Sequence, residues 1–207
     1  MKNASVNYIM KEEYLDSAYN AFKIESESIL ATGEAMDREE FRRAVVALAS
    51  ADRIAAAGCG HSGIACRHFA HLMCCIDLPA RFLSPAEAPH GGLGYLHEGD
   101  VLVVVSRGGK TDELITIAEV AKIKGATVIC VTEKLDSPLA NLSDIKLKMA
   151  ISRECDKYNC QGTTSFAVTN AIFDALQTAL LEYTGYKNET FALIHPGGAV
   201  GKRLNNK

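Results

Sequence analysis

The sequence predicts one α/β domain in which a parallel sheet is covered by helices on both faces. Short apolar runs alternate with helical patterns along most of the chain, which is the rhythm of parallel strands joined by crossover helices. The run VLVVV at 101–105 is apolar at every position, as a strand buried on both faces should be. The length of 207 residues suits a single domain that needs no disulfide or metal for stability. We therefore expect a doubly wound, five-stranded sheet.

The elements follow one another in a regular order. Residues 8–50 are helical in pattern, and Asp37 is placed to cap the second helix of this segment. We treat 1–207 as one domain, divided into N-terminal helices (1–50) and a sheet domain with its C-terminal tail (51–207). The runs expected to form strands are 53–57, 80–83, 101–105, 127–131 and 146–151. The helices expected between and after them are 62–75, 112–124, 137–142 and 165–183.

Composition excludes several classes of function. The net charge is −3 and the basic residues are dispersed, so nucleic acid is not an expected partner. The N-terminus has no signal-peptide pattern and no run is long enough to span a membrane, so we expect a cytoplasmic protein without membrane contact. Seven cysteines in no metal-finger spacing fit a reducing compartment. Cys59, Cys66 and Cys130 are expected to be small core residues.

A glycine-rich loop, GCGHSG at 58–63, follows the first predicted strand and opens a helix. Its letters match the dinucleotide fingerprint G-x-G-x-x-G. A dinucleotide site also needs an acid at the end of the second strand, where this chain has Phe82-Leu83-Ser84 and no acid before Glu87. We therefore disfavour NAD and expect no cofactor. A tight turn with close helix packing is the structural alternative for these glycines.

A second loop, SRGGKTDE at 106–113, follows VLVVV and precedes another helix. The hydroxyls of Ser106 and Thr111, the flexible glycines and the helix N-terminus are the components of an anion cradle. Thr111 is also placed to cap the helix. Arg107 and Lys110 either reach a phosphate or lie in solvent. In a flavodoxin-like strand order 2-1-3-4-5 the two loops meet in one crevice, which predicts a small phosphorylated ligand.

Two further motifs accompany GCGHSG: SPAEAPHGGLG at 84–94 and FALIHPGGAVGKRL at 191–204. Together these three motifs resemble the sugar isomerase (SIS) domain family, most closely its arabinose 5-phosphate isomerase branch. The similarity extends from Ile24 to Leu204. Many members of this branch continue into a regulatory CBS pair, and we expect an SIS domain without that pair.

The resemblance implies a homotetramer that interconverts an aldose phosphate and a ketose phosphate through an enediolate, with no redox cofactor. It assigns catalysis to Glu113, Glu154, His195 and His90, with His61 standing where the family usually has a lysine. Binding of the substrate and its phosphate is assigned to Gly60, Ser62, Ser106, Arg107, Gly109, Lys110, Thr111, Thr163 and Ser165.

Each assignment has a simpler competitor. Glu113 could be only a first-turn helix acid, Glu154 a surface loop acid and His90 a turn residue. The H-P-G-G element at 195–198 could be a structural turn. At the level of function, the alternatives are a non-catalytic sugar-phosphate-binding regulatory protein and an isomerase for a hexulose or heptulose phosphate. A metal site built from the three histidines of the motifs is the weakest alternative, because they lack ligand spacing.

Overall fold

The computed structural model describes residues 13–205. Two helices, α1 (Glu13–Ala35) and α2 (Arg38–Ala49), precede a parallel sheet. Its strands are β1 (Ile54–Gly58), β2 (Ala80–Phe82), β3 (Val101–Val105), β4 (Thr127–Thr132) and β5 (Ile145–Lys148). The other helices are α3 (His61–Cys74), α4 (Asp112–Ile123), α5 (Pro138–Leu142), α6 (Thr163–Thr184), α7 (Asn188–Ile194) and α8 (Gly198–Leu204). Two 3-10 turns, η1 (Ala88–His90) and η2 (Gly92–Tyr95), lie between β2 and β3.

The five strands are arranged in the order β2-β1-β3-β4-β5, and every neighbouring pair is parallel. This confirms the predicted fold class and strand order. The order reverses between β1 and β3, where Gly58 pairs with Val105 at the last position of both strands. The loops that leave these two strands therefore start next to each other.

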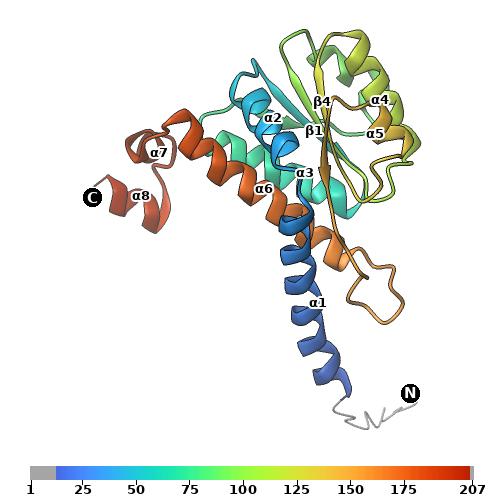
Figure 1. Cartoon of the computed structure of the whole chain (residues 1–207). Coiled ribbons are helices and arrows are strands. Elements are labelled where there is room, and N and C mark those ends of the chain that lie inside the picture. The colour runs from blue at the N-terminus through green and yellow to red at the C-terminus, as the bar shows by residue number, and fades with distance from the viewer. Residues whose placement is uncertain (1–12, 206–207) are drawn as a thin grey trace, which may run out of the picture.

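Side chains of successive strand residues point to opposite faces of the sheet, which produces two apolar layers. Val101, Val103 and Val105 pack in the layer covered by α2, α3 and α6. Leu102 and Val104 pack in the layer covered by α4 and α5. Figure 1 shows the sheet between these two groups of helices. Helices on both faces explain why VLVVV has no polar position.

Most element boundaries agree with the predictions to within two residues, and two differences are larger. The fifth strand ends at Lys148, not at Ile151. Met149 still donates to the Thr132 carbonyl of β4, but the backbone of Ala150 is hydrogen-bonded to α1. The N–H of Ala150 donates to Thr32 Oγ1 at 2.9 Å, and the Thr32 hydroxyl donates to the Ala150 carbonyl at 3.3 Å. The second difference is the tail, which forms α7 and α8 beyond the single long helix that was predicted.

Other local predictions have mixed outcomes. The Asp37 carboxylate caps α2 by accepting from the N–H groups of Glu39 and Glu40, at 2.8 and 3.0 Å, as predicted. Cys66 and Cys130 are buried as predicted, whereas the prediction for Cys59 is wrong because it lies exposed on the loop after β1. Residues 8–12 of the predicted N-terminal helical segment lie outside the described residues.

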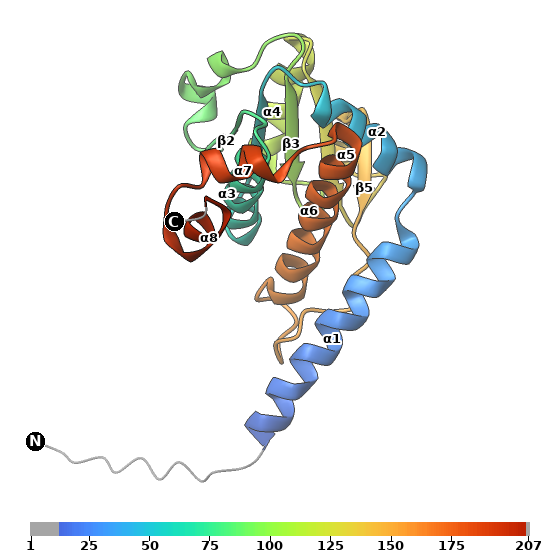
Figure 2. The ribbon, with the colours of Figure 1, turned by 90° about the vertical axis from the view of Figure 1, so that its left-hand side faces the viewer.

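The helix α1 extends beyond the sheet domain, as Figure 2 shows. Several large apolar side chains on it are exposed, among them Tyr19 and Phe22 at 73% and Leu30 at 69%. A groove of about 1100 Å³ lies between α1, α2 and α6, lined largely by apolar residues such as Met36 and Phe41. Of the helices between residues 13 and 205, none is both long and apolar enough to cross a bilayer.

Candidate active site

The loops after β1 and β3 form the centre of the site. Although Cys59 is exposed, partial burial of its thiol and, in second place, the negative charge of Glu113 raise the pKa of this group. Glu113 lies in the first turn of α4. The Glu113 side chain itself is exposed. The structure thus starts the two predicted loops side by side, because Gly58 at the end of β1 pairs with Val105 at the end of β3.

The hydroxyls of the second loop form a pair. Ser106 Oγ and Thr111 Oγ1 lie 3.0 Å apart, and the Gly109 N–H donates to Ser106 Oγ at 3.1 Å. Thr111 occupies the N-cap position of α4, but its side chain makes no capping hydrogen bond. The alternative that Thr111 serves only as a helix cap is therefore not what the structure shows. The first turn of α4 keeps its N–H groups uncapped by a side chain, next to two hydroxyls.

Gly109 fixes the path of this loop. Its φ of +63° belongs to the left-handed region, and a Cβ there would lie 1.9 Å from Ser137 Oγ. The next residue along, Lys110, is exposed and makes no ion pair with any residue in the described part of the chain. The loop therefore presents a flexible cation beside a rigid backbone turn.

The loop after β1 packs tightly against the sheet. A Cβ on Gly63 would lie 2.5 Å from the Gly58 carbonyl oxygen, so the glycines allow the close helix packing that was the structural alternative. Gly60 has a φ of +55° and opens α3, followed by exposed His61 and half-buried Ser62. The His61 ring meets Phe166 of α6 edge-on, with centroids 5.7 Å apart. This contact links the first loop to the start of α6.

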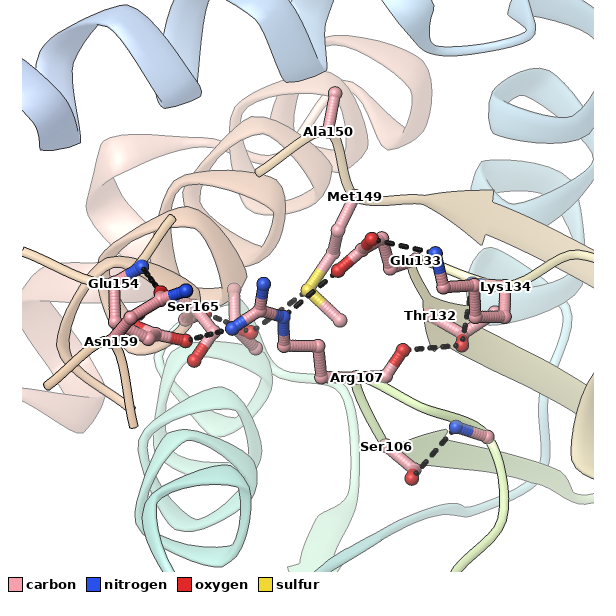
Figure 3. A network of polar contacts seen from close by, with 12 residues as sticks. Ser106, Arg107, Thr132, Glu133, Lys134, Met149, Ala150, Glu154, Asn159 and Ser165 are labelled. Atoms are coloured by element: carbon pink, nitrogen blue, oxygen red, sulfur yellow. Dashed lines mark hydrogen bonds and ion pairs between the residues drawn. The ribbon is translucent and has the colours of Figure 1, made fainter. Parts of the chain in front are cut away.

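Glu154, on the loop between β5 and α6, is 1% exposed and is not the surface loop acid of the simpler interpretation. Its Oε1 accepts a hydrogen bond from Arg107 Nη1 at 2.6 Å. Its Oε2 accepts from the Ser165 N–H at 3.1 Å and from the Thr163 hydroxyl at 3.4 Å. Figure 3 shows this carboxylate between the arginine and the start of α6. Thr163 and Ser165 therefore contact Glu154 in this structure.

Arg107 also binds a second carboxylate, Glu133, which sequence analysis missed. Arg107 Nε donates to Glu133 Oε2 at 2.9 Å, and Lys134 Nζ lies 2.9 Å from Glu133 Oε1. Burial works to raise the pKa of Glu133, but the hydrogen bonds from Arg107 and Lys134 outweigh it, and the pKa is lowered. Only the position of Glu133 in the sequence could have indicated this role. Glu133 directly follows β4, at the same edge of the sheet as the two loops.

His195 does not join this site within one chain. It stacks on Phe191, with ring centroids 4.8 Å apart, between α7 and α8. Phe191 and Cys75 line one pocket, and Tyr186 donates from its hydroxyl to the Cys75 carbonyl at 3.1 Å. Cys75 lies at the far end of α3 from His61. The tail therefore occupies the opposite end of the molecule from the two loops.

His90, the last of the sequence-predicted residues, lies exposed at the end of η1, on the segment that leaves β2. Residues 13–205 contain no group of three or more His, Cys, Asp or Glu side chains arranged to hold a metal ion. His61, His90 and His195 thus form no such group within the described part of one chain.

The family of the protein follows from this fold and its sequence. Residues 47–179, more than half of the chain, match the SIS domain, and the chain belongs to the SIS domain family. Among curated proteins, arabinose 5-phosphate isomerase KdsD of Pseudomonas aeruginosa is 32% identical over 96% of this chain and 61% of its own length. KdsD of Escherichia coli K12 is 34% identical over 73% of this chain and 46% of its own length. This chain thus spans less than two thirds of these relatives.

Solved structures give the same fold. A Listeria monocytogenes protein described as a candidate sugar-phosphate isomerase is 38% identical, with a TM-score of 0.87 over 90% of this chain and 98% of its own. An E. coli CFT073 protein in complex with arabinose 5-phosphate is 25% identical, with a TM-score of 0.83 over 95% and 100% of the two chains. The Vibrio vulnificus NanR protein complexed with ManNAc-6P is 27% identical, with a TM-score of 0.76 over 92% and 71%.

Proposed function

We propose that this chain is a sugar-phosphate isomerase that interconverts an aldose phosphate and a ketose phosphate, with arabinose 5-phosphate as the first substrate to test. The observation that carries the proposal is the Ser106–Thr111 hydroxyl pair, 3.0 Å apart, at the uncapped start of α4. This pair lies where the strand order reverses, which is the usual ligand position of such a sheet. The arabinose 5-phosphate complex of one structural neighbour and the names of the curated relatives support the same ligand class.

In this proposal the phosphate binds to the hydroxyls of Ser62, Ser106 and Thr111 and to backbone N–H groups at the starts of α3 and α4. Gly60 and Gly109 let the backbone approach the phosphate, since both have positive φ. Lys110 supplies a charge from the exposed side of the loop. The sugar then extends toward Glu113 and the start of α6.

The reaction needs a base and no cofactor. After ring opening, a carboxylate takes the C2 proton of the aldose and gives an enediolate, and a proton is returned to C1. The C2 hydroxyl proton leaves as the C1 oxygen gains one, so no oxidant or reductant is consumed. Exposed Glu113 and buried Glu154 are the two proposed proton-transfer groups. His61, His90 and His195 are proposed to assist ring opening and to bind the sugar oxygens.

We also infer that the active form is a homotetramer in the cytoplasm. The exposed apolar residues of α1 support self-association, and seven free cysteines fit a reducing compartment. In a shared site, His195 of one subunit completes the crevice of its neighbour, since it lies far from its own.

A mixing experiment tests the shared site. His195→Ala and Glu154→Gln should each retain only about a hundredth of the wild-type activity, and the mixture after subunit exchange should regain full activity in about a quarter of the sites. A mixture as inactive as its components would exclude a site shared between subunits.

The function itself is tested with a panel of pentose, hexose and heptose phosphates. Turnover and a rise in the unfolding temperature are measured for each compound. We expect isomerisation of arabinose 5-phosphate. Stabilisation by a sugar phosphate without any turnover would contradict the enzyme and indicate a regulatory binding protein.

A further inference from the structure

The Arg107 guanidinium is already occupied. Its Nε binds Glu133 at 2.9 Å and its Nη1 binds Glu154 at 2.6 Å, while its side chain is 34% exposed. It therefore joins the loop after β3 to the segments that follow β4 and β5 (Figure 3). The other cation of the loop, Lys110, is exposed and makes no ion pair within residues 13–205, so it is the cation available to a ligand.

Glu154 depends on this arginine. A buried carboxylate is stable only when a partner compensates its charge, and Arg107 is the cation that touches it. The second oxygen of Glu154 is held by the first turn of α6. The planar guanidinium can bind two carboxylates from different directions, which the point charge of a lysine does poorly.

Arg107 is in turn fixed from the opposite side. Its carbonyl oxygen accepts from the Glu133 N–H at 3.0 Å and from the Thr132 hydroxyl at 3.1 Å. The hydrogen bonds from Arg107 and Lys134 stabilise the charged form of Glu133, which is why its pKa is lowered despite burial. The contacts therefore form a chain, in which the end of β4 and Glu133 contact Arg107, and Arg107 contacts Glu154.

We propose that Arg107 is a positioning residue, which acts on the reaction through the Glu154 carboxylate and does not donate to the sugar phosphate. The first half of this statement rests on the proposed isomerase function. The second half concerns phosphate binding alone and can be tested without turnover.

The decisive measurement is a double-mutant cycle with Arg107→Gln, Glu154→Gln and the double variant. Arg107→Gln should lower kcat on arabinose 5-phosphate by about a hundredfold, with KM changed less than about threefold, because a misplaced catalytic group loses about that much. In the Glu154→Gln background the same change should alter kcat by less than about twofold. If the two losses multiply, Arg107 acts independently of Glu154 and the proposal is overturned. Arg107→Lys, which keeps the charge, should recover part of the activity.

Arg153→Gln is the matched control. Arg153 neighbours Glu154 but donates only to backbone carbonyls, those of Glu154 at 3.0 Å and Asp156 at 2.9 Å. Its substitution removes the same charge near the site without touching the carboxylate, so kcat should stay within about twofold of wild type. A loss equal to that of Arg107→Gln would mean that general charge, not positioning, is responsible.

Affinity for inorganic phosphate, measured by calorimetry, separates the two proposals. Lys110→Gln should weaken it about tenfold, as expected for loss of a charge-assisted contact, while Arg107→Gln should change it less than about twofold. A loss with Arg107→Gln as large as with Lys110→Gln overturns the inference. If wild-type protein isomerises no sugar phosphate of the panel, the proposed function fails by itself, and this measurement still decides whether Arg107 binds phosphate.

Discussion

The helices α4 and α6 both start at the carboxyl edge of the sheet, and neither begins with a local side-chain cap. At α4 the Thr111 hydroxyl turns to Ser106, and the first turn is left open. At α6 the first residue is preceded by Gly162, and the Glu154 carboxylate arrives from the preceding loop to accept the Ser165 N–H. A helix N-terminus attracts an anion, and at α6 a carboxylate of the chain takes that position. In the proposed function the phosphate takes the corresponding position at α4.

The largest expected effect comes from removing the carboxylate that accepts from the first turn of α6. Glu154→Ala should lower the free energy of unfolding by about 3–5 kcal/mol, because it leaves Arg107 without its buried partner and α6 without its acceptor. Urea unfolding followed by circular dichroism measures this. A loss below about 1 kcal/mol would mean that the two helix starts do not differ in the way described.

A methyl group at Gly109 should disturb the loop before α4, the helix whose start has no side-chain cap. Gly109→Ala places a Cβ 1.9 Å from Ser137 Oγ in a residue with φ of +63°, so we expect a loss of about 3 kcal/mol from strain and crowding. The control is Gly108→Ala, where a Cβ meets nothing within 4 Å. Equal stability of the two variants in urea would contradict this account of the turn.

Removal of one hydroxyl from the open helix start should affect binding more than folding. Ser106→Ala should weaken inorganic phosphate binding about tenfold, or about 1.4 kcal/mol. Stability should change little, because the Gly109 N–H also donates to the Ser106 carbonyl at 3.1 Å. Thr116→Ala, which removes an exposed hydroxyl farther along α4, should leave the phosphate affinity at the wild-type value. Calorimetric titration of both variants distinguishes a ligand site from an ordinary loop.

The smallest expected effect is a pH dependence at Glu133. Because its pKa is lowered in the folded chain, its contribution to stability is complete above the unfolded-state pKa of about 4.3 and is lost as pH falls through the lower, folded-state pKa. The stability difference between wild type and Glu133→Gln should therefore be constant from about pH 5 to 7 and shrink below about pH 4. We expect less than about 1 kcal/mol, since the ion pairs are partly exposed. A difference that grows toward low pH would contradict the assignment.

The two helix starts also differ in how far sequence could predict them. The open one lies within a single loop, and the residue types of 106–111 predict its hydroxyls and glycines directly. The closed one depends on ion pairs from Arg107 to residues 26 and 47 positions away, and no local pattern records such contacts. The alternation of elements predicted a parallel sheet, and the flavodoxin-like order supplied the sequence of its strands, whereas the end of β5 involves a hydrogen bond from α1. The sequence thus predicted the residue types within one loop, but it did not predict which distant residues fold against them.

The paired hydrogen bonds between Thr32 and Ala150 have a consequence for the order of assembly. They join positions 118 residues apart, so α1 leaves the ribosome long before the segment that it must hold. At roughly 5–20 residues per second, that interval lasts on the order of 6–24 s. The segment between β5 and Glu154 is thus hydrogen-bonded to a helix that is synthesised early in translation. An amino-terminal truncation that removed Thr32 would leave the latest-made loop of the crevice without this attachment.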